Sequence, residues 1–242
     1  AAKELGNLGI KIIIGPVFNE NQAYLDGLKE ITFISLTNKG GNKSKNIINA
    51  GINATSQLNS IKKFIELNNI KKTIFLTPDV NYKEEIEKAI DNSKIKILGN
   101  YIYKTDPTKL TNQIEKITNY KRRKQNLKDE IVRLEKSNQS SKKRLIEKLK
   151  KKDTIGSVKF DSIVIADFDE GLKSITTSLL YTDISPKTKY FITLNQWFDK
   201  TLLKESSSQP LYFPSINKKN YEDFSLEYFD KFNQYPNQLS FL

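Results

Sequence analysis

The sequence predicts an α/β protein built on parallel β-sheets. Short apolar runs rich in Ile, Val and Phe alternate with amphipathic segments, and the connections between most of them are short. The run at 162–166 is apolar without alternation, as in a strand that is buried on both faces of a parallel sheet. Together these patterns are typical of sheets wound by crossover connections.

The first 70 residues predict strands and helices in turn. Residues 10–14 read Ile-Lys-Ile-Ile-Ile and end at Gly15-Pro16, which predicts a strand followed by a turn. A polar stretch that holds Gly40-Gly41, residues 38–45, predicts a loop. Further strands are expected over 31–35 and 47–52, and helices over 21–30 and 53–69.

The alternation continues along the rest of the chain. Asp106-Pro107 predicts the start of a long helix, because Asp is a good N-cap and Pro fits the first helical turn. Strands are expected over 73–76, 95–103, 162–166 and 189–194, and helices over 82–90, 170–181 and 221–232.

The charge of the protein is concentrated in one segment. The 32 residues 121–152 hold fourteen basic and four acidic side chains, a local charge of +10 out of a formal total of +12. The remainder of the chain is nearly neutral. The whole-chain charge is therefore no argument for a nucleic-acid-binding fold or for binding to an anionic membrane. It supports only a partner that contacts this basic segment.

The basic segment also has a helical pattern. Ile117, Tyr120, Leu127, Ile131 and Leu134 occupy a and d heptad positions, and a polar stretch at 137–141 then interrupts the helix. This predicts an αα-hairpin. Two interpretations are open, a solvated hairpin whose lysines reflect AT-rich codon usage or a surface for an anionic partner. No aromatic residue lies between residues 120 and 160, so base stacking and a nucleic-acid partner are not expected.

The composition excludes several kinds of site. The chain contains no Cys and no His, which removes disulfides, thiol nucleophiles, the usual general base near neutral pH and the commonest metal ligands. No segment approaches the roughly 18 apolar residues of a membrane span. The first residues lack a signal-peptide core, so the signal of an exported protein would be missing from this sequence.

One motif is similar to a catalytic one. An apolar strand followed by Asp167-Phe168-Asp169 resembles the first motif of haloacid-dehalogenase-type phosphatases, in which two acids act beside Mg²⁺. Gly171 stands where that family has Thr, the motif lies late in the chain, and no later acidic pair completes a metal site. The alternative is a parallel strand with an acidic loop at its end.

Four segments resemble type I periplasmic-binding-protein domains. The first is the strand and Gly-Pro turn at 12–18, and the second is the strand at 73–79 with Asn81-Tyr82 after it. The third is Phe-Asp-Ser-Ile-Val-Ile at 160–165, which is similar to the family's "FDAV" strand. The fourth is the helix 221–232 with the turn 233–237. The resemblance places the family's first strand before Ala1, so lobe 1 is expected to be incomplete in this sequence.

Within this superfamily the sequence is similar to LppC-type penicillin-binding protein activators and to leucine-binding-protein-like domains. The pointers are Leu-Leu-Tyr at 179–181, Asn195-Gln196-Trp197, Tyr-Phe-Pro at 212–214 and the helical insertion before the "FDAV" strand. The resemblance implies lobe 1 over 1–53, completed by 216–242, and lobe 2 over 54–215 with a helical hairpin insertion at 108–152.

The resemblance also implies candidate ligand-binding residues. In solute receptors of this fold, amides and hydroxyls in the cleft hold the carboxylate of an amino acid, and an acid binds its amine. Carried over by position, the candidates are Asn19, Ser35, Tyr82 and Asp167. Asn19 stands where a hydroxyl is common, and Lys83 replaces the Gly usual after Tyr82. For each candidate the alternative is an ordinary polar residue at the end of a strand.

The function implied is that of a non-enzymatic exported protein without catalytic residues, metal or cofactor. It would be a periplasmic lipoprotein, anchored to the envelope, that regulates peptidoglycan synthesis by contacting a penicillin-binding protein or another envelope protein. The alternative is a solute receptor of an ABC transporter, with an amino-acid-type ligand in the interlobe cleft. The phosphatase is a third hypothesis.

Overall fold

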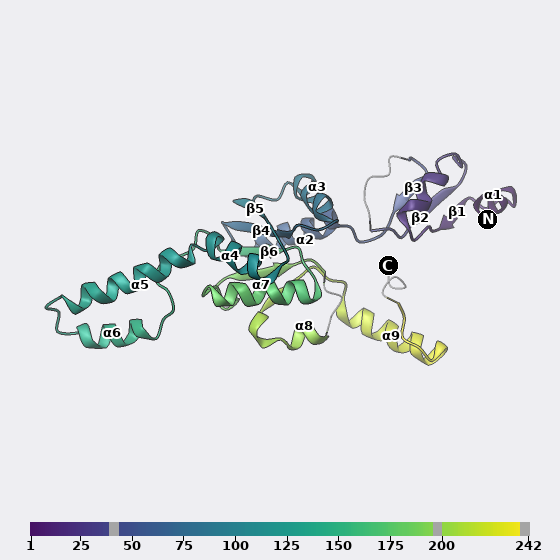
Figure 1. Ribbon diagram of the computed structural model, residues 1–242. Helices are drawn as coiled ribbons and strands as arrows, with labels where there is room; N and C mark the ends of the chain where they lie inside the picture. Colours follow the sequence, from purple (N-terminus) through teal and green to yellow (C-terminus); the bar gives the residue numbers. More distant parts are fainter. Residues whose placement is uncertain (39–43, 196–199, 238–242) are drawn as a thin grey trace. The chain divides into compact units, whose positions relative to one another are not determined.

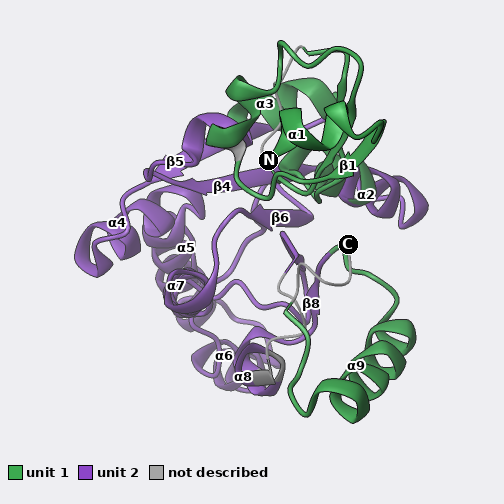
Figure 2. Ribbon diagram, turned by 90° about the vertical axis from the view of Figure 1, so that its right-hand side faces the viewer, with its two compact units in different colours: residues 1–60, 87–94, 214–242 green, residues 61–86, 95–213 purple. Residues whose placement is uncertain are grey.

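In the computed structural model, residues 1–38, 44–195 and 200–237 are described. The predicted loop at 38–45 therefore lies largely outside the described residues, as do Gln196 and Trp197. The chain divides into two compact units (Figure 2): unit 1 comprises 1–60, 87–94 and 214–242, and unit 2 comprises 61–86 and 95–213. The lobe boundaries implied by the resemblance stay a prediction.

Unit 1 holds a parallel sheet of three strands in the order β1-β2-β3: β1 (Ile12–Ile14), β2 (Thr32–Ser35) and β3 (Ile47–Asn49). Ile31, Phe33 and Ile47 form one buried apolar cluster of this unit. The strands confirm the expected positions, with shorter bounds. The helices α1 (Ala2–Asn7) and α9 (Lys218–Phe232) also belong to this unit.

The helix expected over 21–30 is confirmed only in its first part and is wrong from residue 25 onward. The segment forms a short 3₁₀ helix, η1 (Asn19–Tyr24), followed by turns. The amide of Asn46 explains the difference, because its Nδ2 donates to the carbonyls of Leu25, Leu28 and Ile31 at 3.2, 3.0 and 3.3 Å. An Asn side chain that ties down these carbonyls holds the backbone in turns.

Unit 2 is built on a parallel sheet of five strands in the order β5-β4-β6-β7-β8. Helices α2 (Ala54–Leu67) and α3 (Lys83–Ser93) each have residues in both units. The strands are β4 (Thr73–Pro78), β5 (Gly99–Tyr103), β6 (Ser162–Ile165), β7 (Tyr190–Thr193) and β8 (Leu211–Tyr212). All their pairings are parallel, as the sequence predicts.

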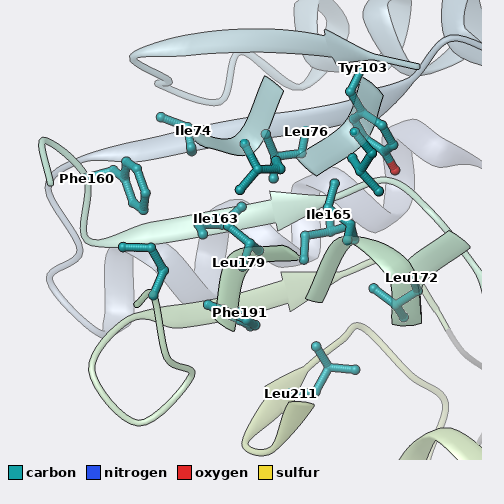
Figure 3. Packing of buried hydrophobic residues seen from close by; sticks show 14 of the residues in the cluster. Ile74, Leu76, Tyr103, Phe160, Ile163, Ile165, Leu172, Leu179, Phe191 and Leu211 are labelled. Atoms are coloured by element: carbon teal, nitrogen blue, oxygen red, sulfur yellow. The ribbon is translucent and has the colours of Figure 1, made fainter. Parts of the chain in front are cut away.

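The core of unit 2 lies between this sheet and two helices, α4 (Pro107–Ile117) and α7 (Asp169–Tyr181). Every residue of β4 and β6 is buried, which confirms that 162–166 is a central strand with both faces covered. Figure 3 shows the apolar side chains of β4, β6 and β7 on the face where Leu172 and Leu179 of α7 pack. The short elements α8 (Lys200–Lys204), η2 (Ser206–Ser208) and β8 were not predicted, because two to five residues carry no readable period.

The long helix expected from Asp106-Pro107 is interrupted. Asp106 caps α4 as predicted, accepting from the backbone N–H of Lys109 at 3.1 Å, but α4 ends at Ile117. Asn119 then adopts a left-handed conformation with φ 50°, and α5 (Tyr120–Glu135) begins after it. Asn tolerates this conformation better than most residues, so the break is local and specific. The polar stretch 137–141 separates α5 from α6 (Lys142–Lys150), as expected.

Helices α5 and α6 form the predicted basic hairpin, which extends away from the sheet of unit 2 (Figure 1). Tyr120, Leu127 and Leu134 of its apolar stripe are buried, while Lys124 is exposed. The narrow stripe leaves the other face of each helix in water. The basic side chains of the hairpin are therefore mostly solvent-exposed.

Arg123 is the exception among these cations, because its side chain is only 7% exposed. Its Nη1 donates to the carbonyl of Thr182 at 2.9 Å, and its Nη2 donates to Thr154 Oγ1 at 2.6 Å. The same guanidinium lies 3.6 Å from the carboxylate of Asp183. Burial lowers the pKa of Arg123, and the charge of Asp183 opposes that shift. Arg123 thus ties the base of the hairpin to the end of α7.

Candidate functional site

Polar side chains gather where the strands of unit 2 end. Thr77 lies near the end of β4, Tyr103 is the last residue of β5, and Thr193 is the last residue of β7. Asp167 follows β6 by two residues. Because the carboxyl ends of parallel strands lie along one edge, this edge is the usual place for a ligand in an open α/β sheet.

Asp167 is the centre of this group. It is 7% exposed, and Tyr103, which is 1% exposed, donates its hydroxyl to Oδ2 in a short hydrogen bond. Oδ1 accepts from the backbone N–H of Phe168 at 2.8 Å. The hydroxyl of Tyr82 lies 3.4 Å from Oδ1 and 3.3 Å from the carbonyl of Ala166, and it shares its proton between these two acceptors. Both carboxylate oxygens therefore have donors within the unit, as a buried charge requires.

This environment raises the pKa values of the two tyrosines. Burial, and after it the negative charge of Asp167, raises the pKa of Tyr103 far above its ordinary value of 10.0. The same two causes raise the pKa of Tyr82. Both phenols hence remain protonated over the physiological range and act as hydrogen-bond donors to the carboxylate.

The loop after Asp167 is shaped to fit the carboxylate. A Cβ at Gly171 would lie 2.5 Å from Asp167 Oδ1, so a larger residue at this position would collide with the side chain. The N-terminus of α7 follows directly, and its unpaired N–H groups favour a nearby negative charge. Gly171, which weakens the phosphatase motif in the sequence, has a packing role here.

Two of the four predicted residues belong to each unit. Tyr82 and Asp167 lie together in unit 2, as described above. Ser35 lies in unit 1, fully buried, where its hydroxyl donates to the carbonyl of Pro16 at 2.8 Å and accepts from the amide of Gln22 at 2.8 Å. Asn19 is the first residue of η1, also in unit 1. Their role as ligand residues stays a prediction.

Two residues of the site were not among the predicted ligand-binding residues. Tyr103 ends the predicted strand 95–103, and Thr193 lies one residue before the end of the predicted strand 189–194, in the same sheet as Asp167, which is the signal that could have found them. The hydroxyl of Thr193 donates to the carbonyl of Ile165 at 2.9 Å and reaches that of Asp167 at 3.4 Å. It therefore braces the backbone that carries the carboxylate.

The chemistry open to this arrangement is limited. In the described residues no three acidic side chains lie close enough to hold a metal ion. Asp167, the first acid of the motif that resembles that of a phosphatase, faces two phenols. The arrangement is that of a carboxylate held in place by its own protein. No described helix is both long and apolar enough to cross a membrane.

No protein-family model matches the chain, and no curated protein matches it. Solved structures do match. A branched-chain amino acid ABC transporter periplasmic ligand-binding protein from Burkholderia xenovorans LB400 aligns with a TM-score of 0.59 at 12% identity, over 98% of this chain and 58% of that chain. The chain has the type I periplasmic-binding-protein fold.

Two further solved structures were matched to the chain. An ABC transporter substrate-binding protein from Desulfitobacterium hafniense has a TM-score of 0.55 at 13% identity, over 96% of this chain and 60% of that chain. The LpoA C-domain from Haemophilus influenzae, a regulator of PBP1A, has a TM-score of 0.49 at 10% identity, over 79% of this chain and 50% of that chain. The chain spans about three-fifths of the length of the first two, and identities this low show the fold alone.

Proposed function

We propose that this chain is part of a non-enzymatic envelope protein of the penicillin-binding protein activator type, which acts by contacting a protein partner. One observation carries the proposal. Asp167, the acid that a solute receptor of this fold would offer to a ligand amine, is buried and already accepts hydrogen bonds from Tyr103, Tyr82 and the N–H of Phe168. An amine would have to displace these donors, at the cost of leaving buried hydroxyls unpaired. The same proposal places the protein in the periplasm, held at the envelope by a lipid anchor.

The second candidate is a solute receptor of an ABC transporter. The observation that favours it is the type I fold itself, which the chain shares with amino-acid-binding proteins such as that from Burkholderia xenovorans. In this case Asp167 and Tyr82 would contact the ligand from unit 2, and Ser35 and Asn19 would do so from unit 1. The two candidates differ in whether a small ligand binds the native state.

Thermal-shift measurements separate the candidates. We expect no amino acid at 1 mM to raise the melting temperature of the protein. A receptor with a micromolar dissociation constant would gain about 4 kcal/mol at that concentration, because a ligand that binds only the native state stabilises it by mass action. A clear shift with one amino acid that is lost in Tyr82→Phe would replace the activator proposal with the receptor.

The partner contact is tested by reversing charges on the hairpin. Lys143, Arg144 and Lys148 are exposed on α6 and make no ion pair in the described structure. We expect the triple change to Glu to weaken binding to an immobilised penicillin-binding protein of the same organism at least tenfold at low salt, and less at high salt, because exposed charges are screened. Lys142 is left intact because its Nζ donates to the carbonyl of Ser137 at 2.9 Å and supports the end of α5.

The matched control changes Lys71, Lys72 and Lys96 to Glu. These residues are also exposed on unit 2, and the change alters the net charge by the same amount away from the hairpin. Equal weakening by both triple variants would show that total charge, and not the hairpin, governs the contact. Absence of any binding by the unaltered chain would remove the activator proposal itself.

A further inference from the structure

We propose that the open edge of β5, with the groove beside it, binds an extended peptide segment of a partner protein that carries apolar side chains flanked by acidic ones. The proposal defines the segment by its chemistry. It therefore stands whether or not the partner is a penicillin-binding protein.

The first observation is that β5 is an unprotected edge strand. In the described part of the chain it pairs only with β4, so the backbone N–H and C=O groups along its other side lack a ladder partner. Leu98, Tyr101 and Ile102 are 55%, 40% and 36% exposed along it. Edge strands are commonly blocked by Pro or by charged side chains, and the residues 99–103 (Gly-Asn-Tyr-Ile-Tyr) contain neither. The opposite edge of the sheet is β8, a strand of two residues that offers few backbone groups for pairing.

The second observation is a groove between β5 and α4. Its volume is about 800 Å³, and Ile74, Ile117 and Phe160 provide apolar surface within it next to the exposed residues of β5. A second hollow of about 540 Å³ adjoins it and shares Lys116 and Asn119 with the first. The groove thus runs from an apolar part beside the strand to a polar part at the turn between α4 and α5.

The third observation is the charge of the groove. Lys116 and Lys159 line the first hollow, and Lys121 and Arg122 line the second. The one acid among the lining residues is Glu115, which lies 3.5 Å from Lys121 and is thereby paired. The excess of positive charge around an apolar floor favours an apolar occupant with negative side chains at its ends.

These observations fit strand addition. An extended peptide that pairs with β5 would satisfy the backbone groups of the edge, which supplies affinity without regard to sequence. Alternate side chains in the middle of that peptide would enter the apolar groove, and acidic side chains at its ends would meet Lys116, Lys159 and Arg122.

The test uses a fluorescein-labelled peptide of eight residues, with Val alternating with Thr in the middle and Glu at both ends, in fluorescence polarisation with the full chain. We expect saturable binding, and at least tenfold weaker binding of a peptide with Lys in place of Glu. The same loss is expected for a peptide that is N-methylated at alternate amides, because it cannot complete a ladder. Ile102→Lys should weaken binding tenfold or more, because a charge on the edge opposes pairing.

The matched variant is Val132→Lys, since Val132 is 45% exposed on α5 outside the groove. Binding unchanged by Val132→Lys and lost with Ile102→Lys supports the proposal. No binding, or equal binding of the N-methylated peptide, overturns it. Concentration-dependent dimerisation that Ile102→Lys abolishes would also overturn it, because the occupant would then be a second copy of the chain.

Discussion

Replacing Arg123 by methionine is expected to lower the free energy of unfolding by about 3 kcal/mol, although thirteen other cations remain in the basic segment. Methionine fills much of the same space but donates no hydrogen bonds. The carbonyls of Thr182 and Asp183 and the hydroxyl of Thr154 would each lose a charged donor. Because these contacts join the hairpin to the end of α7, the substitution is expected to destabilise the base of the hairpin.

Urea denaturation followed by far-UV circular dichroism measures this change. Arg122→Met is the control, because Arg122 is exposed and adjacent. Arg123→Lys should recover little of the loss, since an ammonium group cannot reach three acceptors with the planar fork of a guanidinium. An equal, small effect of Arg123→Met and Arg122→Met would show that the buried contacts contribute nothing to stability.

Raising the pH above 10 is expected to destabilise unit 2 through Tyr103. The pKa of Tyr103 is raised in the folded protein, and that of the unfolded chain is the ordinary 10.0. Above pH 10 the unfolded state releases the phenolic proton while the native state keeps it. The native state then binds more protons, so the free energy of unfolding falls with pH, by about 1.4 kcal/mol per pH unit for this group. Below pH 10 the stabilisation is fully present.

The measurement is a series of urea denaturations between pH 8.5 and 11. Tyr103→Phe should reduce the slope above pH 10, and should also lower stability at neutral pH because Asp167 loses a donor. Tyr101→Phe is the control, since Tyr101 lies on the same strand and is exposed. If both variants retain the slope of the unaltered chain, Tyr103 is not the group that titrates.

The sheet of unit 2 could be predicted because its strands are buried. The apolar segments at 73–76, 162–166 and 189–194 follow from the need of a covered parallel strand for apolar residues on both faces. The prediction errors lie where one side chain or one backbone dihedral angle determines the local secondary structure. Asn46 holds the residues after Tyr24 in turns, and the left-handed Asn119 divides the expected long helix.

The candidate site was predictable only in part. The resemblance pointed to Tyr82 and Asp167, and they are in contact. Tyr103 was overlooked because an aromatic residue at the end of a strand is usually core, and nothing local indicates that its hydroxyl meets a carboxylate 64 residues later. Arg123 was overlooked for a similar reason, since one buried cation in a basic run has the same sequence pattern as its solvated neighbours.

The contact between Tyr120 and Asp153 has a consequence for the evolution of this protein. Its 2.8 Å hydrogen bond brings the first residue of α5 to a residue just beyond α6. The chain therefore enters and leaves the hairpin at nearly one point. Turns can be added to or removed from the far end of the hairpin as a pair while β5 and β6 keep their places. The hairpin is an element whose reach can be lengthened or shortened without redesign of the domain that bears it.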